Sequence, residues 1–145
     1  MLKGIDPLLG PDLLMILRGM GHGDEIAIVD ANYPAVTDAR RLVRMDGHGA
    51  AAILDAILSL LPLDDFAPCV FRPGISGDPA HLEPIMREFQ DIVARFDPSV
   101  EIMPLMGEAF YARVKNAFAL VASGERALYG NIVLRKGVIR QETRQ

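Results

Sequence analysis

His22 is the first residue of this sequence whose surroundings suggest acid or base chemistry. It stands between Gly21 and Gly23, and two acidic residues, Asp24 and Glu25, follow at once. Flanking glycines remove side-chain bulk and permit positive φ angles, so a ligand can come close to the imidazole. Because an imidazole exchanges protons near neutral pH, His22 is a candidate proton shuttle. A tight turn with an exposed histidine explains the same spacing, which alone does not separate the two interpretations.

Asp30 ends a short apolar run, residues 25–30, that predicts a strand buried on both faces of a sheet. Open α/β sheets tend to bind ligands just outside the carboxyl ends of their strands, so Asp30 is a candidate binding carboxylate. A lone Asp here more often caps a helix or anchors a loop. Along an extended chain His22 would lie about 26 Å from Asp30, at about 3.3 Å per residue. Either the His22 loop folds back over the strand, or a site is shared between subunits.

A third candidate site lies in the segment 124–131, which ends in Tyr129, Gly130 and Asn131. A phenol and a carboxamide donate and accept neutral hydrogen bonds, and a tyrosine ring can cover the apolar face of a sugar. This combination suits a polyol ligand. A plain turn before a strand explains the glycines equally well.

The remaining polar residues do not form a recognised cofactor site. Some side chains carry atoms that could bind zinc or iron, but their spacing matches no known metal-binding motif. They are His22, Asp24, Asp46, His48 and His81. The two Gly-His-Gly segments do not follow a strand and open a helix as a phosphate-binding loop would. Cys69 lies in an apolar run, where a thiol is usually inert. We therefore expect neither a metal nor another cofactor.

Length and composition predict one domain over residues 1–145, because a chain of 145 residues matches the usual size of a domain. Half of the residues are hydrophobic and the net charge is -4, which excludes intrinsic disorder and argues against a nucleic-acid partner. The longest apolar stretch, residues 50–63, is interrupted by polar residues and is too short to cross a membrane. The N-terminus lacks the pattern of a signal peptide, so we expect a cytoplasmic protein.

Helical and strand patterns alternate along the chain. Apolar spacing predicts helices over residues 11–20, 50–61, 82–96 and 109–123. Short apolar runs predict strands over residues 25–30, 67–71, 100–105 and 131–134, with a short edge strand at 41–46 and a loop at 72–79. This order predicts an α/β fold, a single three-layer domain with helices on both faces of a mostly parallel or mixed sheet.

Four segments together resemble one family of sugar enzymes. They are residues 20–26, 30–34, 44–47 and 124–134, in an order and spacing that run from Leu2 to Gly137. The chain resembles the D-ribose pyranase and L-fucose mutarotase family in these segments. The fucose branch is closer, because residues 110–120 and the Tyr-Gly-Asn triplet at 129–131 follow its pattern.

The resemblance implies a cofactor-free isomerase that interconverts the anomers of a reducing monosaccharide, L-fucose above all. It also implies a ring-based homo-oligomer, commonly a decamer, with sites between neighbouring subunits. By position, His22 matches the proton donor and Asp30 a substrate-binding carboxylate. Tyr129, Gly130 and Asn131 match the segment that holds sugar hydroxyls.

One position departs from the pattern of the family. Gly107 stands where the family usually has a basic residue, and Glu108 beside it is acidic. Either another cation such as Arg72 or Arg113 reaches the site, or the sugar differs. The alternatives are a ribose pyranase, a sugar-binding or transport-accessory protein without turnover, and a metal-dependent enzyme that uses His22 and His48.

Overall fold

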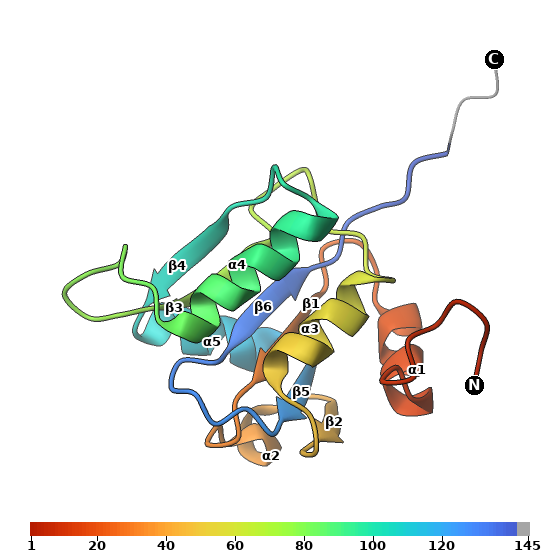
Figure 1. Cartoon of the computed structure of the whole chain (residues 1–145), viewed down its shortest axis with the longest axis horizontal. Helices are drawn as coiled ribbons and strands as arrows, with labels where there is room; N and C mark the ends of the chain where they lie inside the picture. The colour runs from red at the N-terminus through yellow and green to blue at the C-terminus, as the bar shows by residue number, and fades with distance from the viewer. Residues whose placement is uncertain (142–145) are drawn as a thin grey trace.

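A computed structural model describes residues 1–141 of the chain and shows a six-stranded mixed sheet (Figure 1). In the sheet the strands are ordered β2-β5-β1-β6-β3-β4. Five strands share one direction, and β6 runs antiparallel to both of its neighbours, β1 and β3. The strands are β1 Glu25–Val29, β2 Leu42–Met45, β3 Val70–Gly74, β4 Ile102–Met106, β5 Ala119–Ser123 and β6 Ile132–Arg135.

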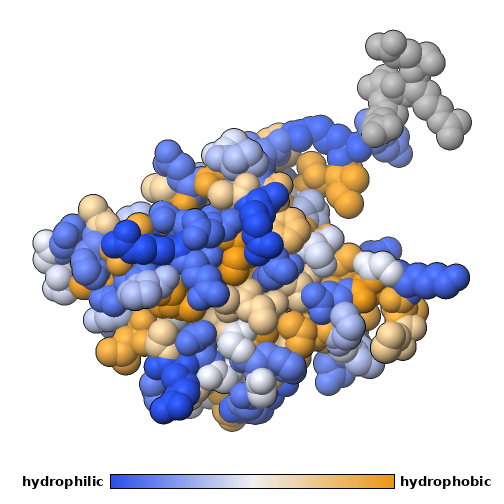
Figure 2. Space-filling model, in the orientation of Figure 1, coloured by the Kyte–Doolittle hydropathy of each residue, from blue (hydrophilic) through white to orange (hydrophobic). Residues whose placement is uncertain are grey.

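Helices cover both faces of this sheet. They are α1 Pro11–Gly19, α2 Ala35–Asp38, α3 Ala50–Leu58, α4 Pro84–Phe96 and α5 Glu108–Asn116. One apolar core joins the sheet to α1, α3 and α4, and a second joins its other face to α2 and α5. Hydrophilic residues spread over the outer face of α4 (Figure 2), because its apolar residues point into the first core. The predicted three-layer α/β fold is confirmed.

The central strand β1 explains how one short segment serves both cores. Its residues from Ile26 to Val29 are fully buried. Ile26 and Ile28 belong to the core under α3 and α4, whereas Ala27 and Val29 belong to the core under α5. Side chains alternate across a strand, so an uninterrupted apolar run fills both layers. The strand expected from this run is confirmed, and Asp30 follows directly after it.

The helix predicted over residues 109–123 is wrong in its second half. Helix α5 ends at Asn116, and residues Ala119–Ser123 form β5, which lies between β2 and β1. All five residues of β5 are buried. Apolar residues at Val114, Ala117 and Val121 mimic helical spacing, but the run from Ala119 is apolar on both faces. Periodicity alone does not separate such a buried strand from a buried helix.

Two smaller corrections concern the segments that flank the sheet edge. β3 begins at Val70 and continues through Gly74, so the first part of the loop predicted at 72–79 is strand. The short helix α2 follows a segment predicted only as loop. The edge position expected for the strand near residues 41–46 is confirmed, because β2 is the last strand on its side.

Among residues 1–141, no helix combines the length and the apolar character that a membrane span requires.

Candidate functional site

Strand direction gathers one group of candidate residues at a single edge of the sheet. The five codirectional strands end at this edge, and the antiparallel β6 begins there. Asp30 follows the last residue of β1, and Asn131 precedes the first residue of β6. Two residues that are 101 positions apart in the sequence therefore become neighbours.

Asp30 and Asn131 form a reciprocal, buried pair of hydrogen bonds. The backbone N–H of Asp30 donates to Oδ1 of Asn131 at 2.7 Å, and Nδ2 of Asn131 donates to Oδ2 of Asp30 at 2.9 Å. The two residues are 8% and 5% exposed. The other carboxylate oxygen of Asp30 accepts the backbone N–H of Asn32 at 2.9 Å. Asp30 thus anchors its loop, while each carboxylate oxygen keeps a second lone pair for a hydroxyl donor.

The segment before Asn131 has a strained backbone. Tyr129 has a φ of 62°, the only positive φ outside glycine among the described residues. A tyrosine in this region costs about 1–2 kcal/mol, so the surroundings must hold it there. A Cβ at Gly130 would overlap the side chain of Glu125, which explains a glycine at this position. The strained turn leaves the Tyr129 side chain exposed, two positions before Asn131 in the sequence.

Tyr33 and Tyr111 form a pair of aromatic rings that the sequence analysis did not identify. Their ring centroids lie 6.3 Å apart in a stacked arrangement. The Tyr33 hydroxyl donates to Asp38 at 2.7 Å, and burial together with this carboxylate raises the pKa of the phenol. Tyr33 follows Asp30 by three residues, so an aromatic surface adjoins the carboxyl ends of the strands. Sequence spacing gives no signal for this pair, because 78 positions separate the two residues and the partners come from different elements.

His22 lies at the opposite end of β1, in a tight turn before the strand. The turn places Gly23 at a φ of 86°, as the flanking glycines permit. The Gly21 N–H donates to Oδ2 of Asp24 at 2.8 Å, and the Gly23 N–H donates to the Lys136 carbonyl at 2.8 Å. The turn is therefore fixed to the end of β6 and does not fold back over β1.

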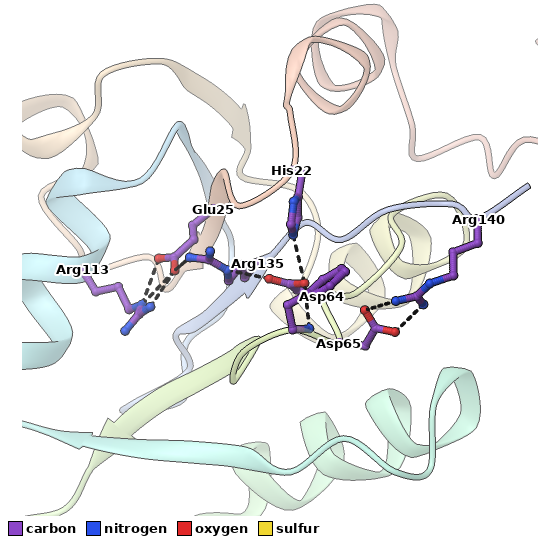
Figure 3. A network of polar contacts seen from close by, with 8 residues as sticks. His22, Glu25, Asp64, Asp65, Arg113, Arg135 and Arg140 are labelled. Atoms are coloured by element: carbon purple, nitrogen blue, oxygen red, sulfur yellow. Dashed lines mark hydrogen bonds and ion pairs between the residues drawn. The ribbon is translucent and has the colours of Figure 1, made fainter.

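A polar network holds the His22 ring (Figure 3). Nε2 of His22 lies 3.1 Å from Oδ1 of Asp64, and Oδ2 of Asp64 accepts Nε of Arg135 at 2.7 Å. Arg135 also lies 3.9 Å from Glu25, which Arg113 binds through two of its nitrogens. The Arg135 guanidinium, the Phe66 N–H and the His22 ring hold the pKa of Asp64 down at about 2. Asp64 is therefore an anion at neutral pH.

The structure separates the candidate residues into two groups. One group lies at the carboxyl end of β1 and consists of Asp30, Tyr129, Gly130 and Asn131. His22 lies at the amino end of the same strand. The intervening β1 has five residues and spans about 16 Å at about 3.3 Å per residue. Within one chain, the two groups are too far apart to contact one small ligand together.

Gly107 opens α5 with a φ of 50°, and nothing lies within 4 Å of the position of a Cβ there. Neither suggested replacement cation is available to fill this space. Arg72 is buried and donates to the carbonyls of Pro73 and Pro79, and its burial lowers the pKa of the guanidinium. Arg113 binds Glu25 and stacks 3.6 Å from the Phe71 ring centroid.

Asp64 is the residue of this region that sequence reasoning missed. It is 42 positions from His22 and follows an apolar run without any motif. Only the return of the chain beside the end of β6 brings it to the imidazole. Within residues 1–141, no three side chains of His, Cys, Asp or Glu cluster closely enough to hold a metal ion.

Comparison with known proteins assigns the chain to a family. The RbsD / FucU transport protein family matches residues 3–139, nearly the whole chain. The chain belongs to this family. The family resemblance expected from the four sequence segments is therefore confirmed.

Several solved structures share this fold. The crystal structure of protein Atu2016 is 39% identical, with a TM-score of 0.92 over 97% of each chain. The fucose mutarotase of Streptococcus pneumoniae, crystallised in complex with L-fucose, is 40% identical, with a TM-score of 0.87 over 96% of this chain and 100% of that one. RbsD of Bacillus subtilis, complexed with D-ribose, is 22% identical, with a TM-score of 0.71 over 97% and 100% of the two chains, a likeness of fold alone.

Proposed function

We propose that this protein is a sugar mutarotase that interconverts the anomers of a reducing monosaccharide, with L-fucose as its substrate. The observation that carries the proposal is the 40% identity to a fucose mutarotase over nearly the full length of both chains. The two polar groups at the ends of β1 supply the chemistry that such a reaction requires. No cofactor enters the proposal, and the cytoplasmic location stays a prediction.

Exchange of anomers requires that a proton reach the ring oxygen while another leaves the anomeric hydroxyl. The ring then opens to a free aldehyde and recloses on either face. We assign the proton on the ring oxygen to His22, whose side chain is 43% exposed and reachable by a ligand. Asp30, Tyr129 and Asn131 hold the sugar hydroxyls, which a carboxylate, a phenol and an amide bind well. Gly130, which has no side chain, allows the backbone of the turn to come close to the bound sugar.

Sharing between subunits follows from the separation of the two groups. A monosaccharide is far smaller than the span of about 16 Å that β1 imposes. His22 of one copy must therefore meet Asp30 and Asn131 of another copy. We propose a homo-oligomer with intersubunit sites, and a decamer is its expected size.

Gly107 bears on which sugar is used. The space beside its backbone is open, and no cation occupies it in the described part of the chain. Because no cation fills this space, the choice of L-fucose rests on the likeness to the fucose mutarotase. D-Ribose is the second candidate substrate, and its exchange between pyranose and furanose forms uses the same ring opening.

The test is saturation transfer by NMR between the anomeric signals of L-fucose, D-ribose and D-galactose. We expect enzyme-dependent exchange with L-fucose and its loss in His22→Ala. His81→Ala is the matched control, because this exposed histidine bonds only Glu83, two residues away. Binding of all three sugars without exchange would indicate a sugar-binding protein and contradict the mutarotase proposal. Wild-type exchange in His22→Ala would show that His22 does not transfer the proton.

A further inference from the structure

We propose that Glu125 is a positioning residue of the sugar site, whose carboxylate ties the turn that carries Tyr129 and Asn131 to the first turn of α3. This inference rests on the proposed function for its effect on sugar binding. Its structural part, the hold of Glu125 on the turn, can be measured without any sugar.

The Glu125 carboxylate bridges two backbone donors from different elements. Oε1 accepts the N–H of Ala127, within the turn, at 2.9 Å. Oε2 accepts the N–H of Ala50, the first residue of α3, at 3.3 Å, although 75 positions separate the two residues in the sequence. Each oxygen therefore serves one element, and the side chain joins them.

Helix α3 lacks an anion of its own at its N-terminus. Gly49 precedes the helix and has no side chain to cap it, and its first turn holds no acidic residue. The first N–H groups of a helix have no partner within the helix, and its N-terminal end attracts negative charge. Glu125 supplies the acceptor and the charge from outside, so α3 is a fixed support for the carboxylate.

The turn is wrapped around the Glu125 side chain. A Cβ at Gly130 would lie only 2.7 Å from Cγ of Glu125, so the backbone next to Asn131 packs directly on this side chain. The Gly130 N–H closes the turn on the Ala127 carbonyl at 3.3 Å. Tyr129 holds a φ of 62° in the same turn, and such a conformation persists only where the surroundings enforce it. Glu125 is the side chain around which it is enforced.

The backbone of Glu125 is fixed to both neighbours of Asp30. Its carbonyl accepts the Ala31 N–H at 2.8 Å. Its N–H donates at 3.2 Å to the Ser123 hydroxyl, which in turn donates to the Val29 carbonyl at 2.7 Å. Glu125 therefore sets the turn relative to the Asp30 loop, independently of the direct bonds between Asp30 and Asn131.

The variant Glu125→Gln tests this assignment with little change of shape. An amide side chain has one acceptor oxygen, and its NH₂ group only donates. One of the two backbone N–H groups, Ala50 or Ala127, would then face another donor. We expect the KM for L-fucose to rise by about tenfold, the worth of one hydrogen bond. The kcat should stay close to wild type, because His22 is untouched and only the grip on the hydroxyls weakens.

Glu125→Asp separates reach from charge. It keeps the carboxylate but is one methylene shorter, so its oxygens cannot span both donors. We expect a raised KM in this variant too. A wild-type KM in Glu125→Asp would show that the bridge to α3 is not needed and would overturn the proposal.

Two controls separate positioning from general effects on the fold. Glu88→Gln makes the same chemical change at an exposed residue of α4 and should behave as wild type. Ala52→Gly weakens α3 itself at an exposed position, because glycine is a poor helix former. We expect this variant to melt at a lower temperature and to keep the KM of wild type.

The structural readout is hydrogen exchange followed by mass spectrometry, without sugar. In Glu125→Gln we expect faster exchange in peptides that cover residues 124–131 and the first turn of α3, and unchanged exchange over α4. Unchanged exchange over residues 124–131, equal acceleration along the whole chain, or a wild-type KM would each overturn the proposal. Absence of sugar exchange in wild type would instead refute the proposed function, and hydrogen exchange would still decide whether Glu125 holds the turn.

Discussion

The substitution Asn131→Asp replaces the amide nitrogen of the buried pair by an oxygen. The donor of one hydrogen bond thereby becomes an acceptor. In the native chain Nδ2 of Asn131 donates to Oδ2 of Asp30 at 2.9 Å. In the variant a carboxylate oxygen would face another carboxylate oxygen at this separation. Two full charges at about 2.9 Å repel by about 6 kcal/mol at an effective dielectric constant of about 20. Two carboxyls at such a distance share one proton.

Keeping that proton in the folded state costs less than the repulsion. A carboxyl with an ordinary pKa of about 3.9 resists protonation at pH 7 by about 4 kcal/mol, at about 1.4 kcal/mol per pH unit. The folded pair therefore retains one proton up to neutral pH, whereas the unfolded chain has released it. Because the folded state then binds more protons, stability falls as the pH rises. Between pH 5 and pH 7 the variant should lose about 2.7 kcal/mol relative to wild type.

The assay is urea-induced unfolding, followed by circular dichroism at pH 5, 6 and 7 and at one protein concentration. Asn116→Asp is the control, because Asn116 is exposed: a carboxylate keeps the bond that Oδ1 accepts from Arg40 at 3.1 Å and loses the bond from Nδ2 to the Ala112 carbonyl at 2.9 Å. We expect the stability of the control to differ from wild type by the same amount at each pH. If Asn131→Asp also parallels wild type, the two side chains are not paired as described and the reasoning is refuted.

Three further predictions concern stability. The pKa of Asp64, about 2 chiefly through Arg135, gives stability that is present above about pH 4 and is lost as the pH falls toward 2; acid titration by circular dichroism should show a smaller loss in Asp64→Asn, and equal losses would contradict this. Arg72→Met should leave the free energy of unfolding unchanged or raise it by about 1 kcal/mol, because the buried guanidinium has no acidic partner among residues 1–141 and its Nε is unbonded there; a loss above about 2 kcal/mol in urea would argue against it. Gly124→Ala should destabilise by about 1–3 kcal/mol, because its Cβ would overlap a backbone carbonyl, whereas Gly47→Ala, with open space, should not; equal melting temperatures would disprove this.

Much of the fold could be predicted from local pattern. The apolar run before Asp30 identified β1, and helical spacing identified α1, α3 and α4, because each of these segments carries its own burial pattern. β5 could not be distinguished in the same way. Its five buried residues continue the apolar spacing of α5, and only its place between two other strands selects the extended form.

The site shows the same division between local and distant information. Asp30 and the turn 129–131 stood out by residue type, but their pairing depends on β6 running antiparallel to β1. Asp64 has no local signal at all, because its role arises from contacts with His22 and Arg135, which lie 42 and 71 positions away. Chemistry that depends on such contacts is visible only once the chain is folded.

The position of β6 also bears on how the protein responds to heat. This strand directly follows Asn131 and ends at Arg135, so it connects one polar group to the other. It is paired on both sides, and its release would leave β1 paired only with β5 and β3 only with β4, so the sheet would be split in two. Local opening of β6 therefore requires nearly the free energy of global unfolding, and its amides should be among the slowest to exchange with solvent. Asn131 and Arg135, which β6 connects, would then be released from their partners only when the sheet itself unfolds.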